Sequence, residues 1–214
     1  MHADPARPPK DAQPERSATA EHELRASDSL FVRLNQQAAL LAAAEVLAGA
    51  ADAAVRRWSR LLHDYALTSD RVVSVHGDAE AATLGWLKPR GVVALLVVEE
   101  CEDDQVVEHL AAALGAMNAV SLTVDRERAE RLAPLTSVLG RLLPGAFVEL
   151  AVDAHAHYPE GATAAVLTPG HLYRAWTPPE PLPEAESGTE RDDDERLALL
   201  TLYGRVRQLD VRPE

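Results

Sequence analysis

The amino-acid sequence predicts an α/β fold. Residues 91–98 form a continuous apolar run, which is typical of a parallel strand covered on both faces. Strand-like and helix-like segments then alternate as far as residue 168. The chain has 214 residues and 47% hydrophobic content, which is enough for one domain with a substantial core. We therefore expect a Rossmann-like parallel sheet with helices on both faces, preceded by a helical pair and followed by a C-terminal docking segment.

The region before the sheet divides into an arm and two helices. Residues 1–29 contain prolines among charges and alanines, and we expect them to form a disordered N-terminal arm. Apolar residues recur at helical spacing over 30–48 and again over 50–66. A short extended piece is expected at 71–75. The stripe that the second helix should bury comprises Val55, Trp58, Leu62 and Tyr65.

The α/β unit follows, and it completes a domain that we place at residues 30–176. A helix is expected to open at Asp103 and another to span 126–143, where Pro144 and Gly145 end it. The predicted strands are 91–98, 119–124, 146–152 and 164–168. Strands that alternate with helices at this spacing indicate right-handed crossovers and a parallel sheet.

The C-terminal part is predicted to be a linker followed by a docking segment. Residues 177–196 are rich in proline and acidic residues, which favours a linker. Residues 197–214 are too apolar to remain free, and we expect them to form a helix or strand that docks on this domain or on another chain. The candidate interface residues are Leu200, Leu202, Tyr203, Val206, Leu209 and Val211.

Charge and cysteine content exclude several classes of partner and site. The net charge of −13 argues against a nucleic-acid partner and against binding to an anionic membrane surface. No apolar run approaches the roughly 20 residues of a membrane span. The single cysteine excludes an internal disulfide, and a cytoplasmic location is the default expectation. The excess of arginine over lysine is typical of a bacterial protein with a high-GC genome.

Three short motifs occur in an order and at spacings that resemble the aldehyde dehydrogenase superfamily. They are Lys88-Pro-Arg-Gly-Val-Val93, Gly115-Ala-Met-Asn118 and Leu143-Pro-Gly-Ala-Phe-Val148. The resemblance covers about residues 33–170 and implies the N-terminal helices and the first part of the family's NAD-binding domain. The segments that hold the family's catalytic glutamate and cysteine have no counterpart here.

The residues that the resemblance assigns to chemistry are mostly replaced. Glu100 stands where the family has an oxyanion-stabilising asparagine, and a carboxylate would repel an oxyanion. Asn118 is retained, whereas Thr123 begins the segment that replaces the lysine and glutamate that hold the adenosine ribose. We therefore expect no catalytic residue, no bound cofactor and a loss of NAD binding.

Two other features could carry chemistry. Cys101 lies among carboxylates, which disfavour the thiolate, so we expect a poor nucleophile. Asp153, His155 and His157 form the one metal-like cluster, because alternate residues of a strand share a face. No second ligand cluster accompanies them in the sequence, and two loop histidines without a metal are the simpler interpretation.

These observations lead to one functional hypothesis and two alternatives. The hypothesis is a non-catalytic aldehyde dehydrogenase-like subunit that assembles with a catalytically intact aldehyde dehydrogenase or an enzyme of the same pathway. One alternative is an NAD-linked oxidoreductase component that contributes to a shared active site. The other, less favoured, is a small metal-dependent hydrolase that uses His155 and His157.

Overall fold

The structure is a computed structural model that divides into two compact units, residues 1–35 and residues 36–214. It describes residues 35–69, 74–77, 82–98, 100–152, 161–175, 177–182 and 191–211. The predicted N-terminal arm, residues 1–29, lies outside these ranges. The description that follows concerns the unit 36–214. None of the described helices is long and apolar enough to cross a membrane.

The predicted helical pair is present. Residues 36–48 are helical, and α2 spans Ala53–Thr68. The N-cap of α2 is Asp52, whose side chain accepts a hydrogen bond from the backbone N–H of Ala54 at 2.7 Å. The stripe expected from helical spacing is the buried face of α2: Val55, Trp58, Leu62 and Tyr65. Trp58 and Tyr65 therefore anchor the core of this chain.

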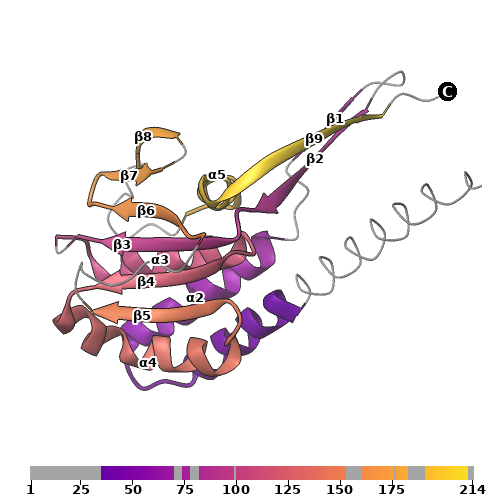
Figure 1. Cartoon of the computed structure of the whole chain (residues 1–214). Coiled ribbons are helices and arrows are strands. Elements are labelled where there is room, and N and C mark those ends of the chain that lie inside the picture. Colours follow the sequence, from indigo (N-terminus) through magenta and orange to yellow (C-terminus); the bar gives the residue numbers. More distant parts are fainter. Residues whose placement is uncertain are drawn as a thin grey trace, which may run out of the picture. The chain divides into compact units, whose positions relative to one another are not determined.

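The main sheet has six strands in the order β5-β4-β3-β6-β7-β8. The first four strands in this order are parallel, and β7 and β8 continue the sheet in antiparallel fashion (Figure 1). Their bounds are β3 Val92–Val97, β4 Ala119–Val124, β5 Phe147–Val152, β6 Thr163–Leu167, β7 His171–Arg174 and β8 Thr177–Pro181. All four strands predicted for the α/β unit are confirmed within one or two residues.

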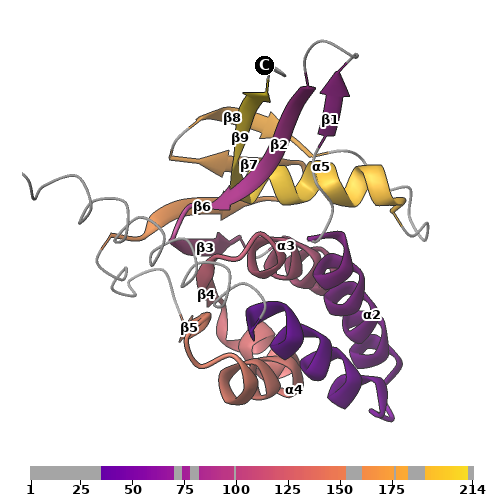
Figure 2. The same cartoon turned by 90° about the vertical axis from the view of Figure 1, so that its right-hand side faces the viewer.

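The helices that connect the parallel strands lie on the same face of the sheet. Helix α3 (Asp103–Gly115) joins β3 to β4, and α4 (Arg126–Leu142) joins β4 to β5. Because the chain moves outward in one direction from β3 to β5, right-handed crossovers place both helices on one side. Figure 2 shows α2, α3 and α4 together on that side. The α/β class is as predicted, but the expectation of helices on both faces is not met by the described helices.

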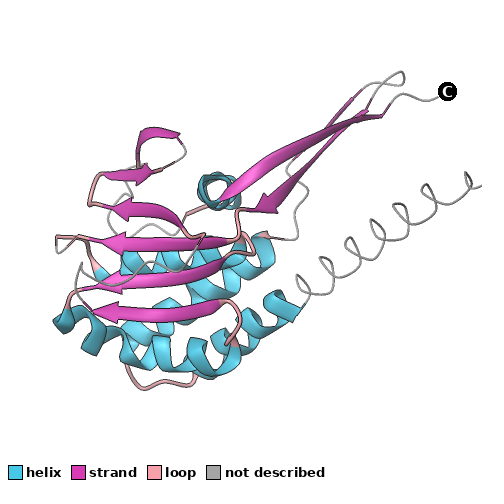
Figure 3. Ribbon diagram, in the orientation of Figure 1, coloured by secondary structure: helices cyan, strands magenta, loops and turns pink. Residues whose placement is uncertain are grey.

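A second sheet of three strands was not expected from the sequence. It has the order β1-β2-β9, with both pairs antiparallel (Figure 3). We call this sheet the ribbon: β1 is Ser74–Gly77, β2 is Ala82–Pro89 and β9 is Gly204–Val211. Strand β2 escaped prediction because Gly85, Lys88 and Pro89 interrupt any apolar alternation. Strand β2 precedes β3 in the sequence, and β9 follows α5. The pairing of β2 with β9 therefore brings together segments from before and after the α/β unit.

The predicted linker at 177–196 is wrong at both ends. Residues 177–181 form β8, which pairs with β7, and helix α5 already begins at Asp193 and ends at Tyr203. Asp192 caps α5 in a capping box: its side chain accepts from the Glu195 N–H, and the Glu195 side chain accepts from the Asp192 N–H. The acidic run that suggested a linker is therefore, in part, a helix N-terminus.

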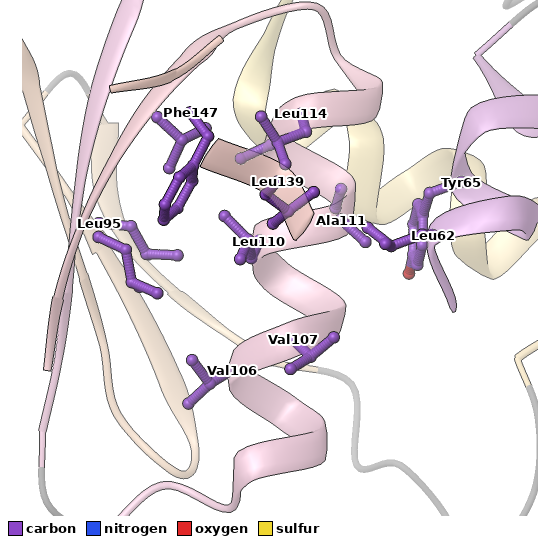
Figure 4. Packing of buried hydrophobic residues seen from close by; sticks show 14 of the residues in the cluster. Leu62, Tyr65, Leu95, Val106, Val107, Leu110, Ala111, Leu114, Leu139 and Phe147 are labelled. Carbon is purple, nitrogen blue, oxygen red and sulfur yellow. The ribbon is translucent and has the colours of Figure 1, made fainter. Parts of the chain in front are cut away.

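One hydrophobic core holds the unit together, and it lies between the sheet and the helices. In Figure 4, Leu95 of β3 and Phe147 of β5 lie opposite Leu110 of α3, with Leu139 of α4 beside them. Leu62 and Tyr65 of α2 lie against the other side of α3. Helix α3 is buried nearly all around because helices lie on one side of it and the sheet on the other.

Candidate functional site

The place to look for a site in a parallel sheet is the crevice at the carboxyl ends of its strands. Here that crevice is bounded by the connection from β3 to α3, which includes Val98 and Cys101, and by Asp125, which follows β4. Helix α3 begins with Asp103 and Asp104 in its first turn, and its N-cap Glu102 makes no side-chain capping bond. The crevice is therefore rich in carboxylates.

A buried arginine from α4 occupies this crevice. The Arg128 side chain is only 3% exposed. Its guanidinium donates to the carbonyl of Val98 at 3.0 Å, to the carbonyl of Cys101, and to the Asp103 carboxylate at 3.0 Å. Asp125 Oδ2 lies 3.5 Å from the same guanidinium. The Arg128 side chain thus links the connection between β3 and α3 to the connection between β4 and α4.

The carboxylates of the crevice are engaged by cations of the chain itself. Arg131 donates to Asp103 at 2.6 and 3.0 Å, and these bonds, with those from Arg128, hold the pKa of Asp103 below its usual range despite partial burial. Asp104 accepts from Arg57 at 3.0 Å and from the indole of Trp58 at 2.7 Å. A phosphate entering here would meet paired carboxylates rather than free donors.

A pocket lies at the N-terminus of α4, beside Arg128. Its volume is about 340 Å³. It is lined by Asp125, Arg126, Glu127, Arg128 and Arg131. The lining mixes both signs of charge, and Arg128 and Arg131 are already bound to Asp103. The pocket therefore offers no convergent set of donors or acceptors.

The sequence-predicted residues of this region occupy different environments. Glu100 is exposed in a turn after β3, whereas Thr123 is largely buried near the end of β4. The Cys101 thiol is buried and lies 3.4 Å from the carbonyl oxygen of Leu167, to which it donates. Burial raises the pKa of Cys101, which outweighs the opposing effect of Arg128. The expected weak nucleophile is consistent with this environment, although burial, rather than the neighbouring carboxylates, is the main cause.

Asn118 has a structural role in this chain. Its side-chain carbonyl accepts from the Arg90 N–H at 2.7 Å. Its side-chain amide donates to the carbonyls of Ala113 and Tyr203, each at 3.0 Å. These bonds tie the start of β3, the end of α3 and the end of α5 to one fully buried side chain. No part of Asn118 is left to contact a cofactor.

The metal-like cluster Asp153, His155 and His157 lies outside the described residues. In the described part of the chain, no group of three or more His, Cys, Asp or Glu side chains could hold a metal ion. The candidate cluster is therefore untested by the structure.

The predicted interface residues separate into two groups. Leu200 and Tyr203 are fully buried in the chain's own core, and Leu202 packs against that core. Their expected role as an interface is corrected: α5 covers α2 and α3 of the same chain. Val206 is 47% exposed on β9. Leu209 and Val211 occupy β9 positions opposite Leu84 and Ala82.

A buried polar cluster that the sequence did not reveal fixes α5 in place. His109 Nδ1 lies 2.7 Å from the hydroxyl of Tyr203, and burial lowers the pKa of His109 to about 3. Glu108 accepts from the Tyr65 hydroxyl at 3.1 Å and from Arg191 at 2.7 Å. The sequence signal is a Glu-His pair among the apolar residues in the middle of α3, and this pair does not identify partners 43 to 94 residues away.

Comparisons with known proteins give a likeness of fold alone. No family model matches the sequence, and no curated protein matches it. Among solved structures, the chain is similar to a mutant of proline utilization A from Bradyrhizobium japonicum, with 16% identity and a TM-score of 0.48, over 75% of this chain and 22% of that one. It is similar to betaine aldehyde dehydrogenase from Staphylococcus aureus in complex with NAD+, with 10% identity and a TM-score of 0.47, over 57% of this chain and 29% of that one.

A third similar structure is an NADP-dependent glyceraldehyde-3-phosphate dehydrogenase from Bacillus halodurans, with 14% identity and a TM-score of 0.45. The alignment covers 56% of this chain and 31% of that one. This chain thus spans less than a third of the length of each of these structures. One of the three, from Staphylococcus aureus, is an aldehyde dehydrogenase by name.

Proposed function

We propose that this chain is a non-catalytic, aldehyde dehydrogenase-like subunit that assembles with a catalytically intact aldehyde dehydrogenase or an enzyme of the same pathway, and that it stabilises or regulates that enzyme. The observation that carries the proposal is the free edge of β9. Gly204–Val211 pairs with β2 along one side, and no other described strand pairs with its second side. An eight-residue edge offers a row of backbone donors and acceptors to a strand of another protein.

Among the other edge strands of the described sheets, β8 and β1 are poorly suited to such pairing, whereas β5 is a six-residue edge without proline. Strand β8 contains Pro178, Pro179 and Pro181, which lack backbone N–H donors. Strand β1 is only four residues long. Natural proteins blunt unused edges with prolines and short strands, and β9, with eight residues and no proline, is the longest of the edge strands described.

The crevice supports the non-catalytic half of the proposal. Binding of a dinucleotide would require its pyrophosphate to displace Arg128 from Val98 and Asp103, or to lie against the acidic first turn of α3. Either arrangement is unfavourable, because a buried guanidinium would lose its partners or like charges would meet. The thiol of Cys101 is buried, and burial raises its pKa above that of an ordinary cysteine, so the reactive thiolate is disfavoured.

Purification of the intact chain at native expression from its source tests the proposal. Elution of a full-length aldehyde dehydrogenase, or of an enzyme of the same pathway, with this chain at a fixed stoichiometry is the expected result. Elution of the chain alone, at its own mass of 23.1 kDa, would contradict assembly.

A calorimetric titration with NAD separates the proposal from the oxidoreductase alternative. We expect no saturable heat up to millimolar NAD, because Arg128 and the carboxylates fill the crevice. Saturable binding would favour a component that still contributes a cofactor to a shared active site. A matched titration with a dinucleotide-binding aldehyde dehydrogenase shows that the assay detects binding.

A further inference from the structure

The junction between α5 and β9 has arginines from two other elements beside it. The guanidinium of Arg174, at the end of β7, donates to the carbonyl of Leu202 in the last turn of α5 at 2.8 Å. The backbone N–H of Arg90 donates to the side chain of Asn118, whose amide donates in turn to the carbonyl of Tyr203. Both arginines are therefore held next to the point where α5 ends and β9 begins.

The register of the ribbon adds three exposed cations at the same place. Lys88 lies directly opposite Arg205, and Arg207 is two positions further along β9. Directly opposite residues of an antiparallel pair share a face of the sheet, as do alternate residues of one strand, so the three positions lie on one face. We define the basic cluster as Lys88, Arg90, Arg174, Arg205 and Arg207.

Cations of the basic cluster repel one another. Lys88, Arg205 and Arg207 are exposed, and no ion pair in the described part of the chain involves them. Burial lowers the pKa of Arg90, and the charges of Arg205 and Arg174 lower it further. Like charges at directly opposite positions destabilise a strand pair. Repulsion between Lys88 and Arg205 therefore opposes the pairing of β2 with β9 at this end.

The carboxyl end of α5 accounts for only one of these cations. Free carbonyl groups at a helix C-terminus attract cations, and Arg174 binds one of them. Arg205 and Arg207 lie beyond the helix, and Lys88 belongs to another strand. In a chain with a net charge of −13, three exposed cations gathered on one face indicate a site for an anion from outside the chain.

We propose that the basic cluster binds a compact small molecule that bears phosphate groups, and that the bound anion strengthens the pairing of β2 with β9. Guanidinium groups match phosphate oxygens with paired N–H donors, and a lysine supplies a flexible point charge. An anion that contacts both Lys88 of β2 and Arg205 of β9 replaces repulsion between the strands with attraction of each strand to the ligand. This site is independent of the assembly function proposed above.

The extent of the cluster favours a compact anion over a nucleic acid or a membrane surface. Arg205 and Arg207 are two residues apart, which is about 7 Å along a strand. A long polyanion would extend past them along a chain that carries 34 acidic residues against 21 basic ones. A small ligand with two or more negative charges engages the cations without meeting that wider repulsion.

Binding of inorganic diphosphate to the full-length chain tests the inference. In a calorimetric titration at about 0.15 M sodium chloride, we expect saturable binding, whereas sodium chloride added to the same ionic strength should give none. The melting temperature should rise by about 3–6 °C once diphosphate is about tenfold above its dissociation constant. The rise should level off only logarithmically with concentration, as expected for a ligand that binds the folded state alone.

Protein variants locate the site. Arg205→Gln/Arg207→Gln should bind diphosphate at least about tenfold more weakly. Without ligand, the same variant should melt at a higher temperature than the unchanged chain, because it no longer repels Lys88. Lys88→Gln should change both quantities in the same directions. A lower melting temperature for these variants would instead give the cations a structural role and contradict the inference.

A matched control distinguishes the basic cluster from other cations of the chain. Arg126→Gln/Arg141→Gln removes the same charge from exposed positions of α4 and should leave diphosphate binding unchanged. Loss of binding in this control, but not in Arg205→Gln/Arg207→Gln, would place the anion in the pocket at the start of α4 and overturn the inference. Absence of saturable binding, or tighter binding of a single-stranded oligonucleotide than of diphosphate, would overturn it as well.

Discussion

At the scale of single residues, Arg128 decides what the crevice can hold. The sequence indicates an acidic helix start after β3, and the structure places one there. What the sequence could not supply is the cation that meets it, because α4 carries several arginines and only the folded geometry selects one of them. The buried role of Asn118 was missed for the same reason: its three partners come from three separate elements.

Replacing Arg128 with alanine should destabilise the chain strongly. The carbonyls of Val98 and Cys101 and the carboxylate of Asp103 would lose a donor in a largely buried place. We expect the free energy of unfolding, measured by urea denaturation, to fall by about 3–5 kcal/mol. The control Arg131→Ala removes a half-exposed partner of Asp103 and should cost only about 0–1 kcal/mol. Similar losses for the two variants would show that Arg128 is not the tie between the loops.

The buried His109 should make the stability of the chain fall in mild acid. Burial, and to a smaller extent Arg191, lowers its folded-state pKa to about 3, whereas an unfolded histidine titrates near about 6.5. The unfolded chain therefore binds the extra proton first, and stability is lost as pH falls from about 6.5 towards about 3. Between pH 7 and pH 5, this group alone should cost up to about 2 kcal/mol.

The variant His109→Gln isolates that contribution. Glutamine can still hydrogen-bond to the Tyr203 hydroxyl but does not titrate. Urea denaturation at pH 7 and pH 5 should show a smaller loss of stability for the variant than for the unchanged chain. Parallel losses would mean that groups other than His109 control the acid response between pH 7 and pH 5.

At the scale of elements, the helices and strands that were predicted correctly are those that a local hydrophobic pattern defines. Strands β3 to β6 and helices α2 to α4 follow from apolar runs and helical spacing, and they lie where expected. The ribbon was missed because its strands are defined by pairing between β2 and β9, far apart in the sequence, and not by an alternating pattern. The first half of α5 was taken for a linker because its capping acids are also typical of a mobile segment.

The junction between α5 and β9 depends on glycine at position 204. A Cβ atom there would lie 2.3 Å from a methyl carbon of Leu87 and 2.4 Å from its Cγ, so Leu87 would have to change its rotamer. We expect Gly204→Ala to lower the free energy of unfolding by about 1–3 kcal/mol. The double variant Leu87→Ala/Gly204→Ala should cost less than the sum of the two single changes. Strict additivity would show that the two residues do not compete for this space.

At the scale of the whole molecule, α5 and β9 are part of the fold rather than an appendage. Leu199, Leu200 and Tyr203 are buried in the main core. Three buried side chains of this size contribute roughly 5–9 kcal/mol, which is comparable with the entire stability of an ordinary domain. Residues 197–214 were expected to dock on this domain or on another chain, and the part of this segment that lies in α5 packs on its own chain.

A chain that ends at residue 190 should therefore fail to unfold cooperatively. Thermal unfolding, followed by near- and far-ultraviolet circular dichroism, should lose its single sharp transition, because the α2–α3 surface would be left without its cover. The control removes residues 1–29, the arm that the sequence predicts to be disordered, and should keep the transition. A sharp transition in the shortened chain would show that the α/β unit is independent of α5.

The pairing of β2 with β9 can form only after β9 has been synthesised. The two strands are separated by roughly 120 residues, so at typical ribosomal rates β2 waits on the order of 6–24 s for its partner to be made. During that interval, the edge of β2 that β9 will cover is open to the ribosome-associated chaperones and to other nascent chains. The outer edge of β9 is likewise presented in its folded form only after β9 has been made and has paired with β2.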